Sequence, residues 1–157
     1  MRYSQIVGLG HHVPETIITN AQLSTMMETT DEWITERTGI KERRWIDPQK
    51  DTVANMAAKA TRMALQRAKL TEKDIEFIVF ATITPDYFFP GSGVLLQREL
   101  GLDGIGALDI RNACSGFIYA LSVADQFIRS GMYKTILMVG AEIQSTAIDP
   151  TTRGRNT

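Results

Sequence analysis

The single cysteine of the sequence, Cys114, lies in a stretch whose residue types could support nucleophilic catalysis. The mostly apolar segment 105–110 predicts a buried strand, and apolar residues at helical spacing after Cys114 predict a helix that stops at Gly131. Cys114 should therefore lie where a strand turns into a helix. A thiol there meets the positive end of the helix dipole and unpaired backbone N–H groups. Both favour the nucleophilic thiolate, and the N–H groups could also hold a developing oxyanion.

A structural role for Cys114 is the alternative. Free cysteine is among the most buried residue types and usually packs as a small hydrophobic side chain. The neighbouring Ala113, Ser115 and Gly116 are small, which leaves room for a substrate to approach the thiol. The spacing alone leaves both interpretations open.

A second candidate is a nucleotide-binding pair on a helix that Thr30 should cap and Gly39 should end. Trp33 and Arg37 are four residues apart and share one face of that helix. An aromatic plane beside a guanidinium could hold a base and its phosphates. The local sequence favours a different interpretation, in which the tryptophan packs on the core and the arginine covers it.

A third candidate is the loop between Pro85 and Gly91, which contains three consecutive aromatic residues at positions 87–89. These aromatics belong to no periodic apolar stripe. Such a loop suggests a wall of a binding site or a contact between subunits.

The elements that must position these residues alternate between strands and helices, which predicts an α/β domain with a largely parallel sheet. Beyond segment 105–110, strands are expected over residues 5–10, 75–83 and 135–140, and an exposed strand or hairpin over 41–46. Further helices are expected over 21–27 with Asn20 as cap, from 53 onward with Asp51 or Thr52 as cap, and from the cap Ser92 to Gly101.

Composition narrows the classes of function. The 157 residues, 43% hydrophobic and 22% charged, suit a single domain with a packed core. A net charge of -1 without a basic block argues against nucleic acid or a membrane surface as partner. One cysteine excludes an internal disulfide and a cysteine zinc cluster, and a free thiol fits the reducing cytoplasm.

Neither a nucleotide cofactor nor a metal is expected. Gly8 and Gly10 lack the third glycine of a dinucleotide-binding loop, and Pro14 breaks the chain where its helix should begin. His11 and His12 are adjacent on an extended segment, so they point to opposite sides and form a poor metal pair.

Four segments resemble, in order and spacing, motifs of the initiating ketosynthases. These are the 3-oxoacyl-[acyl-carrier-protein] synthases of type III, in the thiolase superfamily. The segments are residues 31–34 (Asp-Glu-Trp-Ile), 37–40 (Arg-Thr-Gly-Ile), 112–117 (Asn-Ala-Cys-Ser-Gly-Phe) and 149–154 (Asp-Pro-Thr-Thr-Arg-Gly). The resemblance implies a thiolase-like α/β fold, with a mixed, mostly parallel sheet and helices on both faces. It identifies residues 1–157 as an N-terminal half-domain whose C-terminal half is absent from this chain.

The resemblance implies a condensing enzyme that initiates fatty acid synthesis. An acyl-CoA primer would acylate Cys114, and malonyl on acyl carrier protein would then lose carbon dioxide and attack the thioester to give a 3-oxoacyl product. The expected partners are acyl-CoA, acyl carrier protein, a second copy in a homodimer and the C-terminal half. No metal, other cofactor, nucleic acid or membrane is expected, and the expected location is cytoplasmic.

The resemblance also implies roles for further residues. CoA should contact Trp33, Arg37, Arg153, Thr29, Thr38 and Gly154. The CoA adenine should lie between Trp33 and Arg153. Phe89 should help to close the acyl pocket of the partner subunit.

One departure from the family is large. The family's cysteine works with a histidine and an asparagine from the second half of a longer chain, and neither His11 nor His12 matches that histidine. The family's fold also needs one more strand just after Thr157. Activity is therefore expected only after completion by the C-terminal half. Two alternatives stay open: a related cysteine acyltransferase of secondary metabolism, and a non-catalytic half-domain that binds CoA or a partner.

Overall fold

The computed structural model describes residues 2–146, 149 and 151, and the chain divides into two compact units. We call residues 2–12 and 52–142 the sheet unit. Residues 13–51, with the described residues from 143 onward, form the minor unit. Each unit has a sheet and buried side chains of its own.

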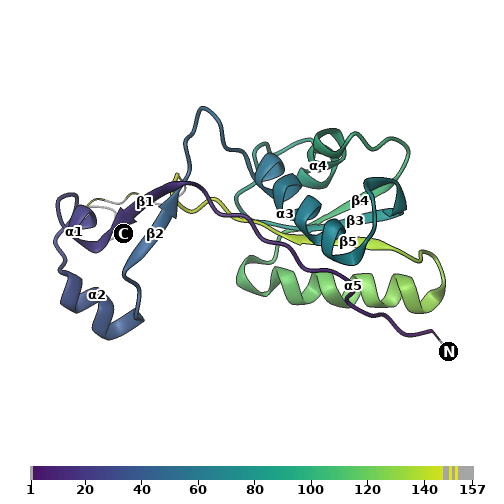
Figure 1. The fold of residues 1–157 in the computed structure, drawn as a ribbon, viewed down its shortest axis with the longest axis horizontal. Coiled ribbons are helices and arrows are strands. Elements are labelled where there is room, and N and C mark those ends of the chain that lie inside the picture. Colours follow the sequence, from purple (N-terminus) through teal and green to yellow (C-terminus); the bar gives the residue numbers. More distant parts are fainter. Residues whose placement is uncertain (1, 147–148, 150, 152–157) are drawn as a thin grey trace. The chain divides into compact units, whose positions relative to one another are not determined.

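The sheet unit is built on a three-stranded parallel sheet in the order β4–β3–β5 (Figure 1). Its strands are β3 (Phe77–Ala81), β4 (Gly106–Ile110) and β5 (Ile136–Gly140). Phe77 lies opposite both Gly106 and Ile136, so the three strands begin and end level with one another. The segments that leave their carboxyl ends therefore meet at one edge of the sheet.

The central strand is the buried one. Ile78, Val79 and Phe80 of β3 are all 0% exposed, as expected for a parallel strand that is covered on both faces. The prediction of a buried strand at 105–110 was wrong in one respect. β4 lies at the edge of the described sheet, and its Leu108 is exposed.

Helices cover both faces of the sheet. The helices of this unit are α3 (Val53–Ala68), α4 (Ser92–Leu100) and α5 (Gly116–Ser130), with short 3-10 turns η1 (Glu72–Asp74) and η2 (Ala113–Ser115). Neighbouring residues of a strand point to opposite faces. On one face Gly93 of α4 packs against Phe80, and on the other Ala120 and Ala124 of α5 pack against Val79 (Figure 1). The expected α/β class is confirmed.

The ends of these helices follow capping rules. Thr52, one of the two candidates, caps α3, and its hydroxyl accepts the Asn55 N–H at 3.0 Å. Gly131 ends α5 with φ of 82°, in the left-handed region that favours glycine. The predicted cap of α4 was wrong. Ser92 is the first helical residue, and its N–H donates to the Asp109 carboxylate at 2.6 Å.

The predicted strand over residues 5–10 was also wrong. Within the described part of the sheet unit, this segment pairs with no strand and lies against α3. A Cβ at Gly8 would collide with the carbonyl oxygen of Ala64, and one at Gly10 with that of Ala60. The two glycines therefore let the extended backbone rest directly on the helix.

The minor unit contains a two-stranded antiparallel sheet and two short helices (Figure 1). They are β1 (Thr16–Thr19), α1 (Asn20–Leu23), α2 (Asp31–Thr38) and β2 (Glu42–Trp45). Thr16 pairs with Trp45 and Thr19 with Glu42, so β2 is the exposed strand expected over 41–46.

The start of α1 differs from the prediction. Thr19, not Asn20, caps the helix, through reciprocal bonds with Gln22, and the helix ends at Leu23 rather than at residue 27. Asn20 lies inside the helix and is 1% exposed. Its amide is used for tertiary hydrogen bonds instead.

Among the residues that the structure describes, no helix is both long enough and apolar enough to cross a bilayer.

Candidate functional site

Cys114 lies where the sequence predicted, in the turn η2 between β4 and α5. Its side chain is exposed. A core-packed cysteine, the structural alternative, is therefore not what this chain shows. The adjacent Ser115 precedes α5, and its hydroxyl donates to the carbonyl oxygen of Asn112 at 2.8 Å, which closes the turn.

The turn that carries the thiol is sharp. Ala113 has φ of 46°, a left-handed conformation that costs a non-glycine residue roughly 1–2 kcal/mol. On the other side of Cys114, Gly116 is buried, and a Cβ there would lie 3.4 Å from the Cβ of Ala81. Because Gly116 has no side chain, α5 can begin close to the sheet. Strained turns that survive in a fold are frequently found at functional sites.

A carboxylate that sequence reasoning missed lies at the same edge of the sheet. Glu142 follows β5, and its side chain accepts the Ile83 N–H at 2.9 Å and the Thr84 hydroxyl at 2.6 Å. It holds the segment that leaves β3. A glutamate two residues after a wholly apolar strand was the only signal in the sequence.

The aromatic loop after β3 is exposed. Phe88 is 89% exposed and Phe89 is 86% exposed. The loop is tied down by its acidic side chain. Asp86 accepts the Val53 N–H at 2.6 Å and the Ala54 N–H at 2.9 Å, at the start of α3. Large apolar side chains held out in this way are typical of an interaction surface.

Trp33 and Arg37 lie together on α2, as their spacing predicted. The Arg37 guanidinium carbon is 4.6 Å from the centroid of the Trp33 ring. Trp33 is 41% exposed, whereas Ile34 is the side chain that α2 buries. The ring is therefore not a core side chain, although Arg37 does cover one of its faces. A base that stacks on Trp33 must use the other face or displace Arg37.

Asn20 is a positioning residue of the minor unit that sequence reasoning assigned only to a cap. Its amide nitrogen donates to the Asp31 carboxylate at 2.6 Å and to the Ile40 carbonyl at 2.8 Å. Its amide oxygen accepts from Arg43 at 2.7 Å. These bonds join α1 to both ends of α2 and to β2. No local sequence pattern predicts such a set of bonds.

Of the remaining predicted site residues, the structure describes some and not others. Thr38 ends α2, with its hydroxyl donating to the Ile34 carbonyl at 2.7 Å, and Thr29 is half-buried just before the helix cap. Arg153 and Gly154 lie outside the described residues. The described site residues thus fall into two groups. The thiol and the aromatic loop lie in the sheet unit, and Thr29, Trp33, Arg37 and Thr38 lie in the minor unit.

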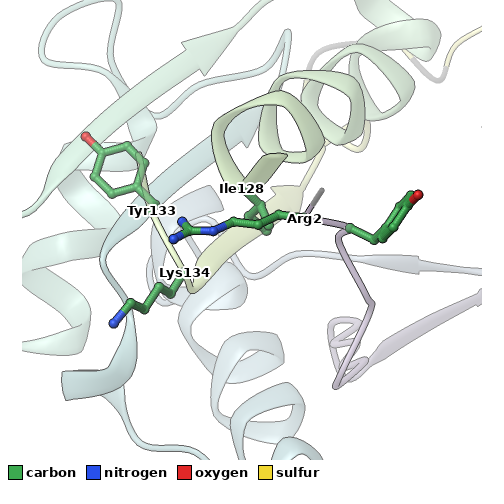
Figure 2. Close-up of a pocket in the computed structure, with 5 residues that line it drawn as sticks. Arg2, Ile128, Tyr133 and Lys134 are labelled. Carbon is green, nitrogen blue, oxygen red and sulfur yellow. The ribbon is translucent and has the colours of Figure 1, made fainter. Parts of the chain in front are cut away.

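An open cavity of about 410 Å³ lies elsewhere in the sheet unit. Its lining residues are Arg2, Tyr3, Ile128, Tyr133 and Lys134 (Figure 2). Figure 2 shows the Arg2 guanidinium reaching toward the space between Tyr133 and Lys134. Lys134 precedes β5, so the cavity is at the amino ends of the strands and not at the edge that carries Cys114.

Comparisons with known proteins agree with the predicted family. The model of the 3-oxoacyl-[acyl-carrier-protein] synthase III family matches residues 108–157, the segment that includes Cys114. The β-ketoacyl-[acyl-carrier-protein] synthase III 1 of Vibrio parahaemolyticus is 48% identical over 151 residues, which are 96% of this chain and 48% of that protein.

Solved structures give the same answer for the fold. The 3-oxoacyl-[acyl-carrier-protein] synthase III of Aquifex aeolicus VF5 superposes with a TM-score of 0.90 at 45% identity, over 95% of this chain and 48% of that one. The priming β-ketosynthase of the R1128 polyketide pathway also gives a TM-score of 0.90, at 35% identity, over 95% of this chain and 44% of that one. The expected thiolase-like fold is confirmed.

The chain spans about half the length of the curated relatives that it matches. Sequence and fold agree along nearly all of its residues. The chain therefore belongs to the 3-oxoacyl-[acyl-carrier-protein] synthase III family.

Proposed function

We propose that the complete protein is a condensing enzyme that initiates fatty acid synthesis, with Cys114 as its acylated nucleophile. The observation that carries this proposal is the exposed thiol on a strained turn at the start of α5. Backbone N–H groups at a helix start have no acceptor within the helix, and the helix dipole favours negative charge there. The same features serve a thiolate and, later, the oxyanion of a tetrahedral intermediate.

The reaction has two stages. The Cys114 thiolate attacks the carbonyl carbon of an acyl-CoA, the thioester bond to CoA breaks, and CoA leaves as a thiolate that takes up a proton. Malonyl on acyl carrier protein then loses carbon dioxide, and its enolate carbon attacks the acyl-cysteine. The carbon–sulfur bond to Cys114 breaks, which releases 3-oxoacyl-carrier protein and restores the thiolate.

The CoA part of the primer is assigned to the minor unit. The half-exposed ring of Trp33, with Arg37 beside it, offers a stacking plane and a cation. Arg153, Thr29, Thr38 and Gly154 complete the proposed CoA contacts. These groups bind CoA equally before and during the reaction, so they act on KM more than on kcat.

Phe89 is assigned to the acyl pocket of a second copy in a homodimer. Its exposed side chain, on a loop anchored by Asp86, supports that role. An exposed free thiol supports a reducing, cytoplasmic location.

Residues 1–157 form, in this proposal, an N-terminal half-domain that condenses nothing by itself. Decarboxylation needs donors for the enolate oxygen, and each such stabiliser is commonly worth about 10²–10³ in rate. In the family these donors come from the second half of the chain. β5 pairs on one side only within the described residues, so a further strand could add beside it.

The test compares residues 1–157 alone with the polypeptide that also carries the C-terminal half. We expect acetoacetyl-carrier protein from the complete enzyme, and none from residues 1–157 or from the complete Cys114→Ala variant. A fully active product from residues 1–157 would overturn the half-site proposal. A complete Cys114→Ala enzyme that still condenses would overturn the role of the thiol.

A second candidate is the same acyl-cysteine chemistry in secondary metabolism, supported by the likeness to the priming ketosynthase of a polyketide pathway. The acceptor distinguishes the two. A complete enzyme that acylates Cys114 but ignores malonyl on the fatty-acid carrier protein would favour this candidate.

A further inference from the structure

Three ties hold the loop that presents Phe88 and Phe89, although both rings are exposed. Asp86 binds the start of α3, as described above. At the other end of the loop, the Asp109 carboxylate accepts the N–H groups of Ser92 and Gly93 at 2.6 and 2.9 Å. Both loop ends are therefore fixed to helix N-termini, where carboxylates are favoured.

The third tie holds the middle of the loop. A terminal nitrogen of Arg111 donates to the carbonyl oxygen of Phe88 at 3.1 Å. The same guanidinium lies 5.1 Å from the centroid of the Phe88 ring. Arg111 thus binds both the backbone and the ring of Phe88, the residue directly before Phe89.

Two of these ties come from the segment that carries the nucleophile. Asp109 is in β4, and Arg111 follows the strand, three residues before Cys114. The aromatic loop and the thiol are therefore held by one short stretch of chain. Arg111 therefore gives a direct physical link between Phe88 and the strand end beside the turn that carries Cys114.

We propose that Arg111 is a positioning residue that fixes Phe88, and through it sets how far Phe89 extends as the wall of the acyl pocket. The inference rests on the proposed function for the role of Phe89. A wall that is held in place rejects an acyl chain that is too long, because the chain cannot push it aside. Without Arg111, a longer acyl chain can displace Phe89, so Arg111 contributes to selection by chain length.

The anchoring itself can be tested without any turnover. In the complete enzyme, hydrogen exchange of the peptide that covers residues 83–91 should speed up about 3- to 10-fold in Arg111→Met. The control is Arg98→Met, which changes an exposed arginine on α4. It should leave the exchange of this peptide unchanged. Arg111→Lys keeps a cation with N–H donors but lacks the planar guanidinium, so it should restore part of the protection.

The consequence is tested with acyl-CoA primers from acetyl to decanoyl. The ratio of kcat/KM between the best primer and one four carbons longer should fall about 3- to 10-fold in Arg111→Met. It should recover partly in Arg111→Lys and stay unchanged in Arg98→Met. A merely structural role of Arg111 would lower kcat/KM for all primers alike.

The outcomes separate this inference from the proposed function. Phe89→Ala should by itself reduce the dependence of kcat/KM on primer chain length, which we call the primer profile. If it does so and Arg111→Met does not, the inference about Arg111 is wrong while the pocket role of Phe89 stands. If Phe89→Ala leaves the profile unchanged, the pocket role fails, and the role of Arg111 in chain-length selection falls with it. Unchanged exchange in Arg111→Met overturns the inference whatever the profile.

Discussion

The two units of the chain are stabilised in different ways. In the sheet unit, the central strand β3 is covered on both faces, and Ile78, Val79 and Phe80 lose all contact with solvent. In the minor unit, the best-buried side chain of its short helices is Asn20, an amide with hydrogen bonds to α2, to β2 and to the segment between them. Apolar packing dominates in the sheet unit, whereas in the minor unit a polar network adds to the burial of Ile18 and Ile34.

The difference corresponds to the two proposed tasks. The sheet unit holds a strained turn. A tightly packed sheet can keep Ala113 in its left-handed conformation, whereas a more loosely packed fold would let the residue relax to a more favourable one. The minor unit has to present a tryptophan and a cation on a short helix, which needs orientation more than rigidity. Hydrogen bonds to both ends of α2 supply that orientation.

The largest expected effect is on the apolar packing of the sheet unit. Phe80→Ala removes a fully buried ring and leaves a cavity, which should cost about 3–5 kcal/mol. Phe88→Ala removes the same side chain from an exposed position and should cost below about 1 kcal/mol. Denaturant unfolding of the complete enzyme measures both. Equal losses from the two variants would contradict the description of the core.

The next effect concerns the polar network. Asn20→Ala leaves Asp31, Arg43 and the Ile40 carbonyl each without one partner, so it should destabilise by about 1–3 kcal/mol. The loss should be local. Hydrogen exchange should speed up over residues 16–45 and stay unchanged over β3. Gln66→Ala, an exposed amide on α3, is the matched control and should be neutral within about 0.5 kcal/mol.

The division of tasks predicts a kinetic effect of similar size. Base–aromatic stacking is worth about 1–3 kcal/mol, so Trp33→Ala should raise KM for acyl-CoA about 5- to 150-fold. kcat at saturating acyl-CoA should change little. Trp45→Phe, which changes the other tryptophan, in β2, should alter neither constant. An unchanged KM in Trp33→Ala would show that this face of α2 is structural.

The smallest effect is a pH dependence. Glu76 accepts the N–H groups of Lys134 and Thr135, which lowers the pKa of this carboxyl from its ordinary value of 4.5. A carboxyl with a lowered pKa in the folded state stabilises the fold above its unfolded pKa and loses that contribution as the pH falls through the folded value. The stability difference between the enzyme and its Glu76→Gln variant should therefore be present at pH 6 and shrink below about pH 4.5. A constant difference over this range would contradict the assignment.

The features that local sequence determines were predicted best. The position of Cys114 between a strand and a helix was readable, because the apolar spacing before and after it changes from strand to helix. The pairing of Trp33 with Arg37 followed from their separation of four residues.

The features that failed depend on partners far along the chain. Asp109 caps α4 from 17 positions away, so the nearer Ser92 was taken for the cap. Residues 5–10 have the composition of a strand, but whether they pair depends on which edge of the sheet is free, and local composition does not report that. The network around Asn20 joins positions 11 to 23 residues apart. The roles of the site residues are not tested by the fold, and they stay predictions.

The most direct test of the account is to locate the acyl group on the complete enzyme after incubation with acetyl-CoA and no malonyl-carrier protein. Peptide mass spectrometry should find one acetyl group, on Cys114, and none on the Cys114→Ala variant. The thiol on the turn before α5 would then be the nucleophile. An acetyl group on any other residue, or one that persists in Cys114→Ala, would contradict the account.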